Sequence, residues 1–275
     1  MSGPHPAMPK PGGELKLRVV SALVLAGGIL AATLWGGWFF RIVWVLVAGV
    51  VAYEWLSIVR GAHAVAGAVG VVAAGLVLAL LPLSPQALAG VAAVAALAGA
   101  AAAPKLTSRL ALELCGVAYA LAFGLIAPAL RDWPQIGLAI ILWSFAVVWL
   151  TDIAAYFTGR RLGGPKLMPR VSPKKTWSGA IGGTLAGVLS GCLVWAWFGP
   201  GAAGPSMLFV ALASLLASIA SQAGDLYESA LKRRFDTKDS SGLIPGHGGF
   251  LDRLDGYWAV LVLAGLALFV FHLSL

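Results

Sequence analysis

Long apolar stretches run along almost the whole chain, separated by short breaks at 82–85, 104–105, 131–134 and 199–205, where prolines, glycines or charges cluster. Uninterrupted apolar runs of about 20 residues are typical of helices that cross a bilayer. The strands of a membrane β-barrel would instead alternate over about 10 residues. The pattern therefore predicts an all-α, polytopic membrane protein with about nine transmembrane helices. Their predicted limits are 17–36, 39–59, 64–81, 86–103, 109–130, 135–158, 178–198, 206–230 and 257–274.

Composition supports this prediction. The 275 residues are 60% hydrophobic and 11% charged, with a mean hydropathy of +0.89. A soluble domain carries about 25% charged residues, so the outer surface is expected to face lipid. Gly179, Gly183 and Gly187 recur every four residues in the seventh predicted span. This spacing favours close packing, either on another helix of the chain or on a second subunit. Cys115 and Cys192 lie in apolar runs and are predicted to be small core residues.

The distribution of basic residues predicts the orientation. With the N-terminus in the cytoplasm, the predicted cytoplasmic segments hold all but two of the 19 Lys and Arg residues, and only Arg41 and Arg131 fall on the opposite side. The C-terminus is then outside. The net charge of +8 fits loops that face anionic lipid and phosphate, and no nucleic acid partner is predicted. We expect a bacterial inner (cytoplasmic) membrane protein whose active site faces the cytoplasm.

The chain divides into three predicted parts. Residues 1–14 contain four prolines and two adjacent glycines, lack the layout of a signal peptide, and are expected to form a disordered tail. Residues 15–134 would form the N-terminal transmembrane helices. Residues 135–275 would form the C-terminal catalytic region, with cytoplasmic loops at 159–177 and 231–256.

Acidic residues are few, and seven of the eleven lie from Asp152 onward. A carboxylate inside a spanning helix costs about 2.5–3.5 kcal/mol on insertion scales, so it needs a partner, a water-filled cavity or an ion. Asp225 lies at the end of the eighth predicted span, and Asp252 precedes the ninth. The connection between them is short enough to hold both side chains close together. Two aspartates that leave positions open for phosphate oxygens suit Mg²⁺.

Both predicted cytoplasmic loops carry groups that suit phosphate. Glycines beside His247 allow backbone N–H groups to face an anion, and nearby lysine and arginine side chains would hold phosphate charge. In the other loop, Lys174 and Lys175 are flanked by hydroxyls. They are predicted to hold a polyphosphate or a lipid phosphate, or to bind anionic lipid. Glu54, late in the second span, is expected to pair with a basic group or to be protonated, and Glu113 to face Lys105 or Arg109.

A family resemblance follows from these residues. Ser229-x-x-Lys232-Arg233, then Lys238-Asp239, then Pro245-Gly246-His247-Gly248-Gly249-Phe250-x-Asp252-Arg253-x-Asp255 resembles the signature of phosphatidate cytidylyltransferases, also called CDP-diacylglycerol synthases. The Ser172–Thr176 string resembles a second motif of that family. Asp152 with Tyr156 and Gly159-Arg160 resembles a third. The resemblance is strong over 140–258.

The resemblance implies a nucleotidyltransferase of phospholipid biosynthesis that converts CTP and phosphatidate into CDP-diacylglycerol and pyrophosphate. It implies Mg²⁺, with K⁺ as a further cation, and a homodimer. Asp225 and Asp252 would be the metal ligands. The residues expected to take part in catalysis are Asp225, Lys232, Asp239, Asp252 and Asp255. Those expected to bind substrate are Asp152, Ser172, Lys174, Lys175, Thr176, Arg233, Lys238, His247, Gly248, Gly249 and Arg253.

Two other functions suit some of the same features. A CTP-dependent polyprenol or lipid kinase would transfer the γ-phosphoryl group and release CDP. An ion-coupled transporter would use Asp152 and Asp225 as relay groups and turn over no nucleotide. The acids gather at one face beside basic, glycine-rich loops and do not trace a path through the bilayer, which favours the nucleotidyltransferase.

Overall fold

The computed structural model describes residues 11–59, 63–81, 84–201, 204–246 and 248–273. This part of the chain forms nine α-helices, one 3-10 turn and a two-stranded antiparallel hairpin. The elements are α1 (Pro11–Trp35), α2 (Gly37–Ile58), α3 (Ala64–Leu80), α4 (Pro85–Ala102), η1 (Ala103–Lys105), α5 (Arg109–Arg131), α6 (Gly137–Leu162), β1 (Lys166–Met168), β2 (Ser172–Thr176), α7 (Trp177–Phe198), α8 (Met207–Arg234) and α9 (Leu251–Leu273).

The helices follow the predicted spans in order. Among the described residues, six helices are long and apolar enough to cross a membrane: α2, α4, α5, α6, α7 and α8. Val19–Trp35 and Ala64–Leu80 are shorter apolar helical stretches. The helical class is confirmed, and the protein is an integral membrane protein. The count of nine crossings and their direction stay predictions.

Several helix ends differ from the predicted limits. α6 continues to Leu162 and α8 to Arg234, while α9 begins at Leu251. The connection between α8 and α9 is therefore 235–250, shorter than the predicted loop 231–256. α1 begins at Pro11, inside the segment expected to be a disordered tail, and residues 1–10 lie outside the described residues. Apolar patterning ends where the charges begin, but Glu, Lys, Arg and Leu are good helix formers, so the helices continue beyond it.

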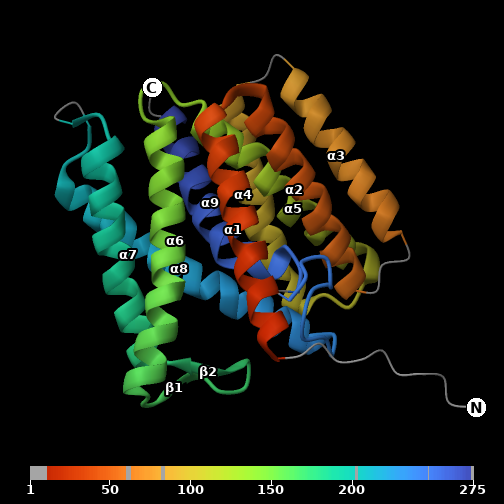
Figure 1. The fold of residues 1–275 in the computed structure, drawn as a ribbon. Helices are drawn as coiled ribbons and strands as arrows, with labels where there is room; N and C mark the ends of the chain where they lie inside the picture. The colour runs from red at the N-terminus through yellow and green to blue at the C-terminus, as the bar shows by residue number, and fades with distance from the viewer. Residues whose placement is uncertain (1–10, 60–62, 82–83, 202–203, 247, 274–275) are drawn as a thin grey trace, which may run out of the picture.

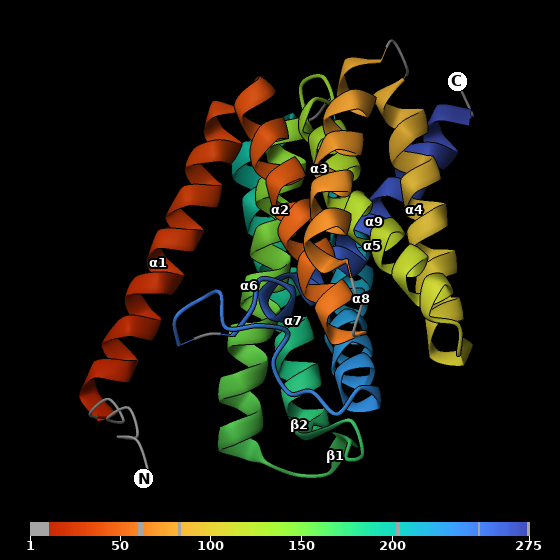
Figure 2. The same ribbon diagram turned by 90° about the vertical axis from the view of Figure 1, so that its right-hand side faces the viewer.

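The helices lie side by side in one bundle, with α1 at its edge (Figures 1 and 2). The β1–β2 hairpin and the α8–α9 connection lie toward the same end, opposite the described end of α9. Arg234 ties the α4–α5 link to this end, because its guanidinium donates to the carbonyl of Ala103 at 2.5 Å and also to that of Leu106. At the opposite end Arg41 pairs with Asp132.

Aromatic side chains join α9 to the N-terminal helices. The rings of Tyr119 on α5 and Trp258 on α9 stack with centroids 4.2 Å apart. Trp44 on α2 stacks on Tyr257 of α9 at 5.4 Å. All four side chains are buried. The first half of the chain therefore fixes the position of α9, whose first turn carries Asp252.

The glycine stripe of α7 packs within the chain. A Cβ atom at Gly183 would lie 2.6 Å from the carbonyl oxygen of Thr151 on α6, and one at Gly179 would lie 2.8 Å from that of Ala155. Of the two predicted partners, another helix of the same chain is thus the correct one. Thr176 caps α7, since its Oγ1 accepts from the Gly179 N–H at 3.1 Å.

The sequence also predicted the surroundings of the two cysteines and of two glutamates. Cys115 is buried, Cys192 is partly buried, and both are free thiols. Glu113 pairs with Arg109 at 3.3 Å, one of its two expected partners. Glu54 pairs with no basic group within the described residues and instead accepts from hydroxyl and backbone N–H groups.

Candidate active site

The Asp252 carboxylate, in the first turn of α9, organises the α8–α9 connection. Lys232 Nζ at the end of α8 donates to its Oδ1 at 2.5 Å. The Gly249 N–H donates to Oδ2 at 2.8 Å, and the Ser240 N–H and Oγ both donate to Oδ2 at 3.0 Å. Three of these donors share Oδ2, and Lys232 is bound to Oδ1, so the carboxylate is held through both of its oxygens. Gly248, with φ +84°, has no room for a side chain, because a Cβ atom would lie 2.6 Å from Asp252 Oδ2.

Glu54 holds the same connection from the opposite side. This fully buried carboxylate on α2 accepts from Ser241 Oγ at 2.5 Å and lies 3.2 Å from Ser240 Oγ, whose single proton it shares with Asp252. It also accepts from the backbone N–H of Leu251, the first residue of α9, at 2.6 Å and from that of Phe250, directly before it, at 3.0 Å. A carboxylate at a helix N-terminus satisfies N–H groups that have no partner within the helix. Glu54 was not among the predicted site residues. An acid inside an apolar span was the available signal.

Lys232 is held between two buried carboxylates. Its ammonium lies 2.5 Å from Asp252 Oδ1 and 2.7 Å from Glu228 Oε2, one turn earlier on α8. The Lys232 side chain is 12% exposed, and those of Asp252 and Glu228 are 6% and 2% exposed. One cation therefore neutralises part of two negative charges in a region that water barely reaches.

Asp225 forms the link to the other motif. Its carboxylate pairs with Lys175 of β2, so the end of α8 meets the hairpin. Ser229 Oγ donates to Asp225 Oδ1 at 3.4 Å. The charges of Asp152 on α6 and Asp255 on α9 both interact repulsively with that of Asp225. Three helices, α6, α8 and α9, thus bring carboxylates into electrostatic range at this end of the bundle.

The two predicted metal ligands, Asp225 and Asp252, are bound to different partners in the described part of the chain. Asp225 and Asp252 each pair with a lysine of their own, Lys175 and Lys232. No group of three His, Cys, Asp or Glu side chains is arranged to hold a metal within the described residues. His247, predicted to bind substrate, lies outside them. Gly249, predicted to offer its N–H group to phosphate, instead donates to Asp252.

The other predicted substrate-binding residues surround this cluster. Thr176 is buried as the cap of α7, and Ser172 is partly exposed. The charge of Arg253 interacts favourably with that of Asp152. The remaining predicted side chains are exposed on the hairpin, the last turn of α8 and the α8–α9 connection: Lys174, Arg233, Lys238 and Asp239.

The oxygen donors present fit a hard cation. Carboxylate and hydroxyl oxygens are the ligands that Mg²⁺ and K⁺ accept. Ser221 Oγ and Glu228 Oε1, on the same face of α8 as Asp225, are buried without a hydrogen-bond partner among the described residues. Such unpartnered oxygens beside Asp225 and Asp255 are what a bound cation would satisfy.

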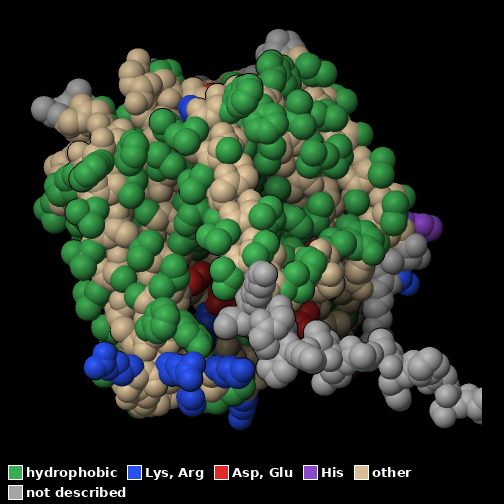
Figure 3. All heavy atoms as spheres, viewed as in Figure 1, with side chains coloured by type: hydrophobic (Ala, Val, Ile, Leu, Met, Phe, Trp, Pro, Cys, Tyr) green, Lys and Arg blue, Asp and Glu red, His purple; other side chains and the backbone are tan. Residues whose placement is uncertain are grey.

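The surface near this site divides by charge. In Figure 3 basic side chains form a band at the end that carries the hairpin, and acidic side chains appear in a recess next to it. Apolar side chains cover most of the remaining visible face. Anionic groups that approach from this end would meet lysine and arginine before the carboxylates, which suits a polyphosphate accompanied by a cation.

The fold and this cluster define an integral membrane protein with paired carboxylates and lysines at one end of its helix bundle. The family assignment comes from comparison with known proteins. Residues 16–271 match the model of the Cytidylyltransferase family. The chain belongs to that family.

Named relatives agree with the assignment. The chain is 41% identical over 262 residues to the phosphatidate cytidylyltransferase of Brucella suis biovar 1 (strain 1330), which covers 94% of this chain and 93% of the relative. The same values hold for the enzyme of that name from Brucella melitensis biotype 1. The phosphatidate cytidylyltransferase of Bacillus subtilis (strain 168) is 41% identical over 133 residues, 48% of each chain.

Proposed function

We propose that this protein transfers the cytidylyl group of CTP to phosphatidate, giving CDP-diacylglycerol and pyrophosphate. The likeness to the Brucella enzymes extends over nearly the full length of both chains, so it includes both motif-bearing segments. The observation that carries the proposal is the pairing of carboxylates with lysines at one end of the bundle, Asp225 with Lys175 and Asp252 with Lys232.

The reaction needs no covalent enzyme intermediate. An oxygen of the phosphatidate phosphate attacks the α-phosphorus of CTP, the bond from that phosphorus to the oxygen bridging toward the β-phosphorus breaks, and pyrophosphate leaves with the electron pair. A phosphate monoester is already a nucleophile. The protein therefore has to position two anions and neutralise their charge.

The proposed metal ligands are Asp225 and Asp252. Bound Mg²⁺ would polarise the α-phosphoryl group and offset its charge. Lys175 and Lys232, which neutralise these carboxylates in the structure, would then be available to phosphate oxygens. Replacement of the lysine by Mg²⁺ explains why each proposed metal ligand is paired with a lysine in the structure. K⁺ as a second cation stays a prediction, supported by the unpartnered oxygens of Ser221 and Glu228.

Other residues take supporting roles in this proposal. Lys174, Arg233, Lys238 and Arg253 hold phosphate charge. Asp239 and Asp255 would orient these cations or water on a bound metal, and Asp152 interacts favourably with the charge of Arg253. Glu54 is a positioning residue, because it acts on the site through Ser240 and the first turn of α9.

Orientation and location are also part of the proposal. The hairpin, the α4–α5 link and the α8–α9 connection, all predicted to be cytoplasmic, lie at one end of the bundle, and Arg41 and Arg131 lie at the other. The active site would face the cytoplasm, where CTP is made, from a bacterial inner membrane. The homodimer implied by the family stays a prediction.

Two variants test the site assignment. Asp225→Asn and Asp252→Asn should insert into the membrane but release little pyrophosphate from CTP, phosphatidate and Mg²⁺. Asp132→Asn, at the opposite end of the bundle, is the control and should keep wild-type turnover. Wild-type turnover by either site variant would contradict its role as a metal ligand. Release of CDP by the unmodified protein would favour the lipid kinase, and ion flux without nucleotide turnover would favour the transporter.

A further inference from the structure

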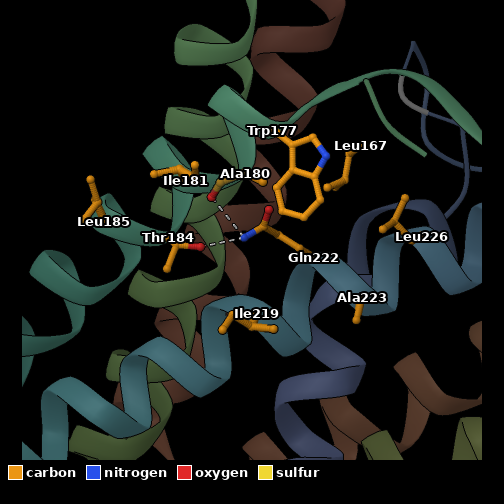
Figure 4. Close-up of a pocket in the computed structure, with 10 residues that line it drawn as sticks. All are labelled: Leu167, Trp177, Ala180, Ile181, Thr184, Leu185, Ile219, Gln222, Ala223 and Leu226. Carbon is orange, nitrogen blue, oxygen red and sulfur yellow. Dashed lines mark hydrogen bonds between the residues drawn. The ribbon is translucent and has the colours of Figure 1, made fainter. Parts of the chain in front are cut away.

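An apolar groove lies between α7 and α8 on the outer face of the bundle (Figure 4). We name it the α7–α8 groove. Its volume is about 450 Å³, and its lining includes Trp177, Ile181, Leu185, Ile219, Gln222 and Ala223. Ile181 and Leu185 are 59% and 62% exposed, so the groove opens away from the helix bundle. In a membrane protein this opening meets lipid.

One end of the groove adjoins the charged site. Trp177 comes two residues after Lys175, and Leu226 directly follows Asp225. The Lys175–Asp225 ion pair therefore sits where the groove ends at the hairpin. The opposite end, at Leu185 and Ile219, lies further along α7 and α8 into the apolar part of the bundle. Leu185 lies eight positions after Trp177 on the helix, a length of about 12 Å at about 1.5 Å per residue.

The middle of the groove carries an amide. The Gln222 side chain donates to Thr184 Oγ1 at 3.0 Å and to the Ala180 carbonyl at 3.4 Å. Its own carbonyl oxygen is turned toward the Trp177 ring in Figure 4. Along its length the groove thus passes from charge, through hydrogen-bonding groups, to purely apolar side chains. A phospholipid has the same order of phosphate, glycerol esters and acyl chains.

We infer that the α7–α8 groove binds an acyl chain of the phosphatidate substrate, with the lipid phosphate at Lys174 and Lys175. This inference rests on the proposed function and adds the path by which the lipid reaches the site. Moving a chain from bilayer to groove gains little hydrophobic free energy, because lipid tails are as apolar as leucine. The groove instead orients the lipid so that its phosphate points toward Asp225. This holds the substrate in the geometry that the reaction needs.

Blocking the groove tests the inference kinetically. Ala223→Trp would fill its middle, and Leu212→Trp places the same side chain three turns away on the exposed face of α8, outside the groove. The indole would occupy the space that the acyl chain needs, so the KM for dioleoyl-phosphatidate should rise about tenfold in Ala223→Trp. The KM for CTP should not change. Dihexanoyl-phosphatidate, whose chains are too short to reach Leu185, should show a smaller rise, and Leu212→Trp should match the wild type.

Labelling of the unmodified protein tests it without a substitution. A phosphatidate with a photoreactive diazirine in one acyl chain should label peptides of α7 and α8 that contain Ile181, Leu185 and Ile219. An excess of dioleoyl-phosphatidate should suppress this label, and dioleoyl-phosphatidylcholine should not. Label spread evenly over lipid-facing helices, or suppressed equally by both lipids, would overturn the inference.

The remaining outcomes separate the inference from the proposed function. If the wild type converts CTP and phosphatidate but Ala223→Trp and Leu212→Trp behave alike with both lipids, the groove has no substrate role. If Ala223→Trp changes the oligomeric state in detergent and leaves the KM for phosphatidate unchanged, a second copy of the chain occupies the groove. If the wild type forms no product from these substrates, the proposed function fails first.

Discussion

Single carboxylates decide how this site is held. Glu54 contacts four donor groups of the α8–α9 connection and the start of α9, and is fully buried. Glu54→Gln keeps the size of the side chain but replaces one acceptor oxygen with an amide that donates. Buried donors left unpaired cost about 1–3 kcal/mol. The variant should unfold at lower temperature in detergent, and its kcat should fall while the KM for CTP changes little.

The matched control for this prediction is Glu113→Gln, whose partner Arg109 is largely exposed. Exposed pairs contribute about 0–1 kcal/mol, so this variant should resemble the wild type. Glu54→Asp should restore part of kcat if the charge at this position holds the connection. Equal loss in Glu54→Asp and Glu54→Gln, with the thermal midpoint unchanged in both, would contradict a positioning role.

Lys232 neutralises two buried carboxylates, Glu228 and Asp252. Removing one partner of a buried ion pair typically costs 3–5 kcal/mol, because a charge is left buried alone. Lys232→Met should therefore destabilise the protein strongly. Adding Glu228→Gln should recover part of the loss, since one of the two stranded charges is removed. A double-mutant cycle on denaturant unfolding measures this coupling, and strictly additive changes would exclude it.

Sequence reasoning found most of this cluster but not its connectivity. The spacing of Asp225, Ser229 and Lys232 placed them on one helical face. In the structure Ser229 donates to Asp225, and Lys232 pairs with Asp252. The role of Glu54 was out of reach, because it lies nearly 200 residues before its partners. Only the packing of α2 on α9 brings these residues together.

At the scale of elements, the α6–α7 pair depends on glycine. A Cβ atom at Gly183 would lie 2.6 Å from a backbone oxygen of α6, which cannot move aside cheaply. Gly183→Ala should lower the unfolding free energy by about 1–3 kcal/mol. Gly28→Ala on α1, where a Cβ meets nothing within 4 Å, should be neutral or stabilise by about 0.5–1 kcal/mol. Thermal unfolding in one detergent compares the two, and equal midpoints would contradict close α6–α7 contact.

Helix ends were predictable where the apolar run begins directly after a capping residue. They were not predictable where charged residues continue the helix beyond the apolar run. The predicted starts of the fifth and seventh spans lie within one residue of α5 and α7, because Ser108 and Thr176 cap these helices directly before the apolar run. The starts of α9 and the ends of α6 and α8 were misplaced by several residues. The β1–β2 hairpin was expected only as loop, since its five-residue strand of Ser, Pro, Lys and Thr has no apolar alternation.

The whole molecule makes a prediction about orientation. In a chain with Cys115→Ala and Cys192→Ala, a cysteine at Arg170 in the hairpin should react with a membrane-impermeant thiol reagent only after the cells are permeabilised. A cysteine at Pro205, in the link between α7 and α8, should react in intact cells. The positive-inside distribution is the physical reason. The reverse pattern would place the active site outside and exclude CTP as its cytoplasmic substrate.

The central claim concerns the bond that is broken in CTP. Purified protein should be supplied with Mg²⁺, phosphatidate and CTP labelled with ³²P at either the α- or the γ-phosphorus. We predict that α-label enters the lipid fraction as CDP-diacylglycerol and that γ-label leaves as pyrophosphate, in equal amounts. Transfer of γ-label to lipid with release of CDP, or no transfer of either label, would contradict it.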